Sequence, residues 1–135
     1  MLIGALGAGA VNAAGSYGAA VNYQLQCMGC HRADGSGEAG RVPSVRRSLA
    51  LLSTIPEGRD FVIRVPGVAQ SPLSNEETAA LLNWMLKNLS DLQIPAGVAD
   101  YSAAEVQRSR GSPLAEVKTL RARLLKTATA KSQHP

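Results

Sequence analysis

The sequence predicts an all-α fold, with about three to five short helices in one domain and a helical extension at the C-terminus. Residues 74–77, Ser-Asn-Glu-Glu, match a capping box, in which the first and last side chains bond each other's backbone amides at a helix start. Residues 76–89 then place leucines, a tryptophan and a methionine on one broad apolar face. A second capping box at residues 102–105 precedes an apolar stripe at residues 114–125.

Composition narrows the functional classes. The chain has 135 residues, enough for one ordinary domain or for a small domain with an appendage. Only 4% of the residues are aromatic, so the core must be built mainly from Leu, Val and Ala. The 14 basic and 10 acidic residues give a net charge of +4, which hints at an acidic partner and is not the footprint of a nucleic-acid binder.

Residues 1–15 are apolar, small and uncharged, as in the hydrophobic region and cleavage zone of a secretory signal. A cut after Ala13 or Ala14 fits this pattern. The positive segment of such a signal is missing, since the first basic residue is Arg32. Either the start codon is misassigned and a basic leader is lost, or the segment stays as a membrane-proximal tail, or it is a leader of no function. It is too short to span a bilayer.

The next stretch predicts a short helix at residues 16–26, which leads into Cys-Met-Gly-Cys-His at residues 27–31. Two cysteines in this spacing with a histidine directly after them are the attachment pattern of a c-type haem. The thiols of Cys27 and Cys30 can each add to one vinyl group of the porphyrin, and His31 then lies under the iron as proximal ligand. A redox dithiol and an incidental pair are the alternatives, and no further cysteine is present to complete a zinc site.

This motif predicts one covalently bound haem c. Because c-type haem is normally attached outside the cytoplasm in bacteria, it also favours an exported, periplasmic protein and gives the apolar leader a purpose. A buried haem would supply apolar bulk that the few aromatic residues do not. Both cysteines are used by the haem, so no structural disulfide is predicted.

From Tyr23 to the histidine, the sequence resembles the N-terminal helix and haem motif of class I c-type cytochromes. The glycine-rich residues 32–37 and the helix at residues 76–89, with its aromatic Trp84, extend the resemblance to about residues 17–90. The resemblance implies a monohaem cytochrome c fold, in which the last helix of the haem domain crosses the first. Trp84 would then pack at the crossing.

In that family, the carbonyl of a proline accepts the second N–H of the proximal histidine. Carried over, this implies that Pro43 orients His31 from the second shell of the iron; otherwise Pro43 simply ends a loop. Several arginines in the same region are candidates for binding haem propionates, since a guanidinium fork suits a carboxylate. These are Arg41, Arg46, Arg47, Arg59 and Arg64.

Residues 44–65 are less regular. The apolar run at residues 49–52 predicts one or two helical turns over one haem face, ended by Glu57 and Gly58. Residues 61–65, Phe-Val-Ile-Arg-Val, correspond in the family to a short helix before the loop over the distal haem face. Their β-branched composition leaves a strand or extended structure open.

The family pattern stops after the haem domain of residues 16–90. Residues 91–101 predict a linker, and residues 102–125 a helical extension in which Pro113 opens the last helix. The apolar stripe of that helix either packs back on the haem domain, which is the commoner outcome, or docks on a partner. Residues 126–135 predict a disordered tail.

The sixth iron ligand of the family is a methionine in the loop before the last helix, and this loop, residues 65–73, contains none. Met85 on the last helix is the candidate distal ligand, or else a core methionine that fills an irregular gap. The other possibilities are an open or water-filled distal site, shielded by Gln70, and ligation by the late residue His134.

The resemblance implies an electron carrier, which passes single electrons from a dehydrogenase to a downstream carrier or oxidase. No catalytic carboxylate pair, nucleophile–base arrangement or nucleotide loop accompanies the motif, so we do not expect an enzyme. A redox protein with an acidic docking face is the expected partner, without nucleic acid or a transmembrane span, and the extension suggests a subunit dedicated to one dehydrogenase. The alternative, favoured by the missing methionine, is a haem-based ligand sensor or weak peroxidase with an open distal iron site.

Overall fold

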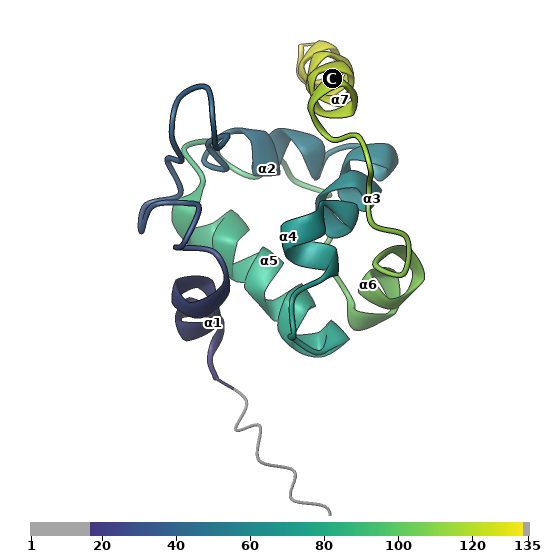
Figure 1. Ribbon diagram of the computed structural model, residues 1–135. Coiled ribbons are helices and arrows are strands. Elements are labelled where there is room, and N and C mark those ends of the chain that lie inside the picture. The colour runs from purple at the N-terminus through teal and green to yellow at the C-terminus, as the bar shows by residue number, and fades with distance from the viewer. Residues whose placement is uncertain (1–16, 134–135) are drawn as a thin grey trace, which may run out of the picture.

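The computed structural model describes residues 17–133, and within them the protein is helical with no strand. The prediction of an all-α fold is confirmed (Figure 1). The helices are α1 (Ala19–Gln26), α2 (Ser48–Leu52), α3 (Pro56–Arg64), α4 (Pro66–Ala69), α5 (Asn75–Leu89), α6 (Ala103–Ser109) and α7 (Lys118–Ser132). No helix among these residues is both long and apolar enough to cross a membrane. The leader at residues 1–15 lies outside the described residues.

Helices α1 and α5 pack against each other, and Trp84 contacts Tyr23 of α1 there, as the predicted crossing requires. The rings of Tyr23 and Trp84 lie with their centroids 5.5 Å apart and their planes tilted by 40°. The Tyr23 hydroxyl donates a hydrogen bond of 2.7 Å to the carbonyl of Arg32, which ties the crossing to the loop after the cysteine motif. The capping box at the start of α5 is also present, with Ser74 accepting from the amide of Glu77 and the Glu77 carboxylate accepting from the amide of Ser74.

Residues 61–65 are not a strand, because all but the last belong to α3. Pro56 stands in the first turn of α3, where its fixed φ suits a helix start and its missing N–H costs nothing. Phe61, Val62 and Ile63 are buried against the other helices, so tertiary packing decides against the β propensity of this stretch. Gly58 was expected to end the helical turns that begin at residues 49–52, but it lies inside α3. A Cβ at Gly58 would overlap the carbonyl of Leu52.

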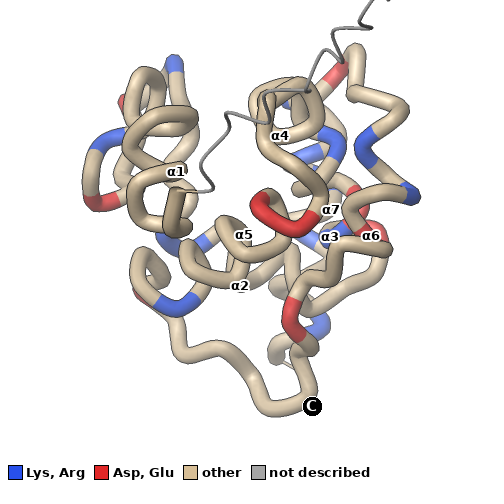
Figure 2. The backbone as a smooth tube through the Cα atoms, turned by 90° about the horizontal axis from the view of Figure 1, so that it is seen from below, with Lys and Arg blue, Asp and Glu red and all other residues tan. Residues whose placement is uncertain are grey.

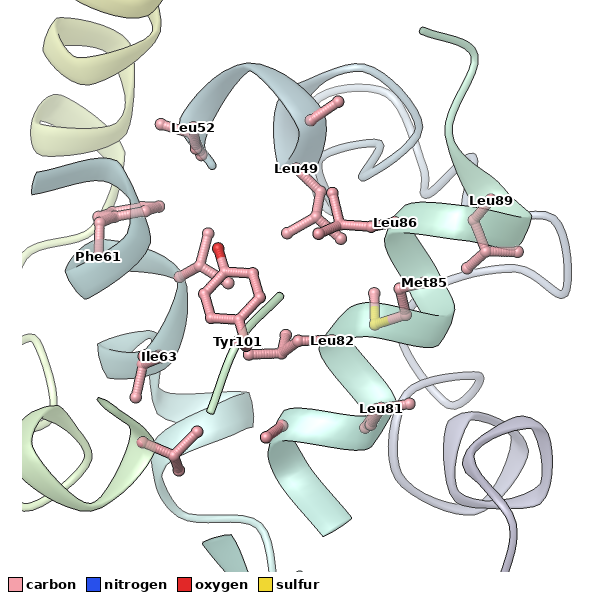
Figure 3. Packing of buried hydrophobic residues seen from close by; sticks show 14 of the residues in the cluster. Leu49, Leu52, Phe61, Ile63, Leu81, Leu82, Met85, Leu86, Leu89 and Tyr101 are labelled. Atoms are coloured by element: carbon pink, nitrogen blue, oxygen red, sulfur yellow. The ribbon is translucent and has the colours of Figure 1, made fainter. Parts of the chain in front are cut away.

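The C-terminal extension packs back on the helices of residues 17–90. Tyr101, Val106, Leu124 and Ala128 are buried in the same cluster as the leucines of α2 and α5. Figure 3 shows Tyr101 among these leucines. Residues 91–101, expected to be a linker, are also fixed: the backbone N–H of Tyr101 donates to the Asn83 side-chain oxygen at 2.7 Å, and the Asn83 amide donates to the Tyr101 carbonyl at 2.9 Å. The extension is therefore part of the domain's core.

Arginines fasten the extension in two places. The Arg59 guanidinium lies 4.0 Å from the ring centre of Tyr101 and donates to both carboxylate oxygens of Glu105 at 2.7 Å. Arg110, at the end of α6, donates to the carbonyls of Leu73 at 2.8 Å and Ser71 at 2.9 Å. Arg110 thus holds the loop between α4 and α5 from outside.

Two predictions for the end of the chain are wrong. The last helix starts at Lys118 and not next to Pro113, because the Glu116 carboxylate accepts the backbone N–H groups of Thr119 and Leu120 and so caps the helix there. The helix also continues through residues 126–132, where a disordered tail was predicted. That part is held by packing and by the Lys131 ammonium, which donates to the carbonyl of Thr54 at 2.9 Å.

Candidate functional site

The site residues predicted from the sequence meet around one cavity of about 260 Å³. Cys27, Cys30, His31, Pro43 and Met85 all line it. They come from the end of α1, the following loop and the middle of α5. The structure therefore brings together residues that are up to 58 positions apart, from 27 to 85, around one space.

The cysteine motif forms a tight turn at the end of α1. The backbone N–H of Cys30 donates to the Cys27 carbonyl at 3.1 Å, and that of His31 donates to the same carbonyl at 2.8 Å. Both thiols are free. Burial, and then the neighbouring Cys30, raise the pKa of the Cys27 thiol to about 11. A thiol attacks as the thiolate, so the raised pKa of Cys27 disfavours that residue as the nucleophile of a redox dithiol.

His31 carries the unsatisfied polar atom of the site. Its Nδ1 is buried and has no hydrogen-bond partner among the described residues. Burial lowers the pKa of His31, and the carbonyl of Pro43 opposes this effect by raising it, although no hydrogen bond between them has good geometry. His31 as a whole is half-buried, and a neutral imidazole is the form of histidine that binds a metal. The described residues contain no cluster of three or more His, Cys, Asp or Glu side chains that could hold a metal ion by themselves.

The backbone around Pro43 is held by a close approach. Gly37 has a left-handed φ of +66°, and a Cβ on it would lie 2.8 Å from the Pro43 carbonyl oxygen. Glu38 and Val42 close the intervening turn with paired backbone hydrogen bonds of 2.8 Å. We call Cys27, Cys30, His31 and Pro43 the motif wall of the cavity.

The rest of the cavity surface is mostly apolar. Three hydroxyl groups line it, and each donates to a carbonyl of its own segment: Ser48 to Ser44 at 2.7 Å, Ser71 to Val68 at 2.9 Å and Thr78 to Ser74 at 2.8 Å. Because each hydroxyl donates its proton to a backbone carbonyl, none of the three offers a free donor to the cavity. The apolar lining residues are Val45, Leu49, Leu52, Phe61, Val62, Val65, Val68, Leu81, Leu82 and Val117. An apolar cavity with two thiols and a histidine at its edge fits a covalently attached porphyrin.

A second wall comes from the stretch where the class I c-type cytochromes, which the sequence resembles, carry their methionine. Val65, Gly67, Val68 and Ser71 line the cavity there, and we call them the loop wall. Gln70, expected to shield an open site, is exposed and is not among the lining residues, so its shielding role stays a prediction.

Met85 is 7% exposed, and its side chain points into the packed interior beside Leu82 (Figure 3). It both lines the cavity and belongs to the core cluster, so its two predicted roles are compatible with its position. His134 lies outside the described residues.

The arginines proposed for propionate binding are nearly all used elsewhere. Four of them pair with carboxylates: Arg41 with Glu38, Arg46 with Asp34 and Asp91, Arg59 with Glu105, and Arg64 with Asp60. Arg47 is exposed and does not line the cavity.

Sequence analysis missed Arg121, which lines the cavity from α7 together with Val117. The sequence pattern predicts Arg121 on the charged face of the last helix, opposite the apolar stripe, and that prediction hid its place at the cavity, although Val117 stands one turn earlier. Val117 and Arg121 are far from the cysteine motif in the sequence, and they reach the cavity only because the extension packs back on the rest of the chain.

The helical structure around a cavity edged by a Cys-x-x-Cys-His motif is consistent with an all-α cytochrome c fold. Two proteins named cytochrome c-552, both from Thermus thermophilus, are 29% identical to this chain over 107 residues. The match covers 66% of this chain and 82% and 72% of the two relatives. No family model and no solved structure matches the sequence. The similarity supports a resemblance to c-type cytochromes over two thirds of the chain.

Proposed function

We propose that the protein is an exported monohaem c-type cytochrome that carries single electrons and catalyses no bond chemistry. The observation that supports this most strongly is the shared cavity of Cys27, Cys30 and His31 with its apolar lining. The likeness to cytochrome c-552 points in the same direction. A haem, when bound, supplies a one-electron couple at its iron.

Each residue of the motif wall has a defined task in this proposal. Cys27 and Cys30 would hold the haem by two thioether bonds, formed by addition of each S–H across a vinyl group. His31 would offer a neutral imidazole nitrogen to the iron, and Pro43 would orient it. The apolar lining would exclude water from the haem face. This burial and the identity of the iron ligands would together set the reduction potential.

The sixth ligand separates two functions. With Met85 on the iron, the protein is an electron carrier whose ligands hardly move between oxidation states. The alternative is a haem-based sensor or weak peroxidase with an open distal site. It is favoured by the loop wall, which offers no methionine, histidine or other strong iron ligand.

Visible absorption of the purified protein, oxidised and reduced, with and without carbon monoxide, tests this choice. For methionine ligation we expect a weak band at the red end of the oxidised spectrum and no response to carbon monoxide. Met85→Leu should remove the band and allow carbon monoxide to bind. A high-spin spectrum and ready carbon monoxide binding in the unmodified protein would overturn the carrier in favour of the sensor or peroxidase.

For the partner, we propose a redox protein, either a dehydrogenase, another cytochrome or an oxidase, in the periplasm. The net charge of +4 supports an acidic docking face. Next to the cysteines, however, α1 carries no charged residue (Figure 2), and Tyr17, Val21, Leu25 and Met28 are exposed there. Electron-transfer rates that fall steeply with ionic strength would support acidic docking, and salt-independent rates would contradict it.

A further inference from the structure

Arg121 reaches the cavity from the C-terminal extension without a carboxylate partner. It lines the cavity in a half-buried position, and no carboxylate of the described residues lies within 4 Å of its guanidinium. Its hydrogen bond is a long one, 3.4 Å from Nη2 to the carbonyl of Ser44. Burial lowers the pKa of Arg121, yet a guanidinium keeps its proton in proteins.

A half-buried cation beside an apolar cavity is costly unless an anion compensates it. Three other half-buried arginines, Arg46, Arg59 and Arg64, pair with carboxylates. Arg110 instead donates short hydrogen bonds to backbone carbonyls, whereas Arg121 has one long bond to a carbonyl. The haem of the proposed function brings two propionate carboxylates, and a guanidinium can bind a carboxylate through two parallel N–H groups. Since the lining hydroxyls donate to the backbone, Arg121 is the cationic group among the lining residues that remains for this task.

We propose that Arg121 binds a haem propionate, which makes α7 of the C-terminal extension a part of the haem site. The inference rests on the proposed function. Helix α7 is fixed in place for this role, because Leu124 and Ala128 are buried and because it packs against α2 and α3 (Figure 1). Val117, one turn before Arg121, lines the same cavity, so α7 presents both an apolar and a charged side chain to it.

The test compares Arg121→Gln, Arg121→Lys and the control Arg123→Gln as holoproteins. Arg123 lies two residues away on the same helix, is exposed and does not line the cavity. Spectroelectrochemical titration gives the equilibrium constant for reduction, and infrared redox difference spectra report the propionate carboxylates. Thermal unfolding of each variant identifies any loss of fold.

We expect Arg121→Gln to lower the equilibrium constant for reduction about fivefold, because an uncompensated propionate stabilises ferric iron, with less than about twofold for Arg123→Gln. Arg121→Lys should keep most of the equilibrium constant and shift the carboxylate band, since an ammonium cannot form the two parallel bonds. This variant carries the test if Arg121→Gln does not fold. Equal effects of the Arg121 and Arg123 variants on haem-loaded protein would overturn this inference alone, whereas protein without thioether-bound haem would overturn the proposed function as well.

Discussion

The two walls of the cavity are built in different ways. The motif wall is largely local: Cys27, Cys30 and His31 are positioned by a turn whose hydrogen bonds span only a few residues. The loop wall is held from a distance, by Arg110, which lies 37 positions beyond Leu73 in the chain. In the first wall the chemistry follows from consecutive residues, and in the second the shape depends on the C-terminal extension. A change in the extension should therefore affect the site without touching the motif.

The largest effect is expected from removing residues 91–135. This deletion would take Tyr101, Val106, Leu124 and Ala128 out of the core and expose their contact surfaces on α2, α3 and α5. We expect a loss of more than about 5 kcal/mol, enough to abolish cooperative unfolding of a marginally stable domain. Thermal melting followed by circular dichroism measures this. A truncated chain that melts like the full one would show that the loop wall does not need the extension.

The deletion is therefore not a clean test of a dedicated partner subunit, because it removes core residues. Point variants on the exposed side of the extension are needed for that question.

Gly37→Ala should have the next largest effect, and it acts on the motif wall. It places a Cβ against the Pro43 carbonyl in a left-handed backbone conformation, so we expect a loss of about 3 kcal/mol in the free energy of unfolding. Gly40→Ala is the matched control: Gly40 has a φ of +78° and no atom within 4 Å of an added Cβ. It should cost about 1 kcal/mol. Equal losses in urea denaturation would mean that the approach of Gly37 to Pro43 does not matter.

Arg110→Ala should loosen the loop wall while the motif wall stays intact. The variant removes charged hydrogen bonds to the carbonyls of Ser71 and Leu73, with an expected cost of about 2 kcal/mol. Arg108→Ala, in the exposed part of α6, is the control. Unchanged stability of Arg110→Ala in urea denaturation would contradict the idea that the extension positions this loop.

The smallest effect concerns pH and the pair that fastens α6. Hydrogen bonds from Arg59 hold the pKa of Glu105 below its ordinary value. Because the folded-state pKa is lowered, the pair stabilises the fold above the ordinary glutamate range, about pH 4.3, and this stabilisation is lost as the pH falls further. Glu105→Gln should cost about 1 kcal/mol at pH 7 and progressively less as the pH falls through the lowered pKa of Glu105. A pH-independent difference in unfolding free energy would contradict this account.

The local features could be predicted from the sequence. The Cys-x-x-Cys-His turn and the capping box of α5 depend on short patterns, and the place of Trp84 at the crossing of α1 and α5 followed from the resemblance. The cavity unites all five predicted site residues, although their roles stay predictions.

What could not be predicted depends on packing between distant segments. Residues 61–64 are helical because they are buried among other helices, against their β propensity. Residues 126–132 are ordered because Ala128 finds a place in the core. Arg121 reaches the cavity only because α7 folds back, and no spacing in the sequence fixes that distance.

The central claim is that the motif wall holds one haem c through Cys27 and Cys30. The most direct test is the mass of the denatured chain. The chain is purified from a bacterial host that attaches c-type haem in its periplasm, and the double variant Cys27→Ser, Cys30→Ser is the control. We predict that the chain carries the added mass of one haem after denaturation and that the double variant carries none. An unmodified mass for the native sequence, under conditions in which a known c-type cytochrome is fully loaded, would contradict the account.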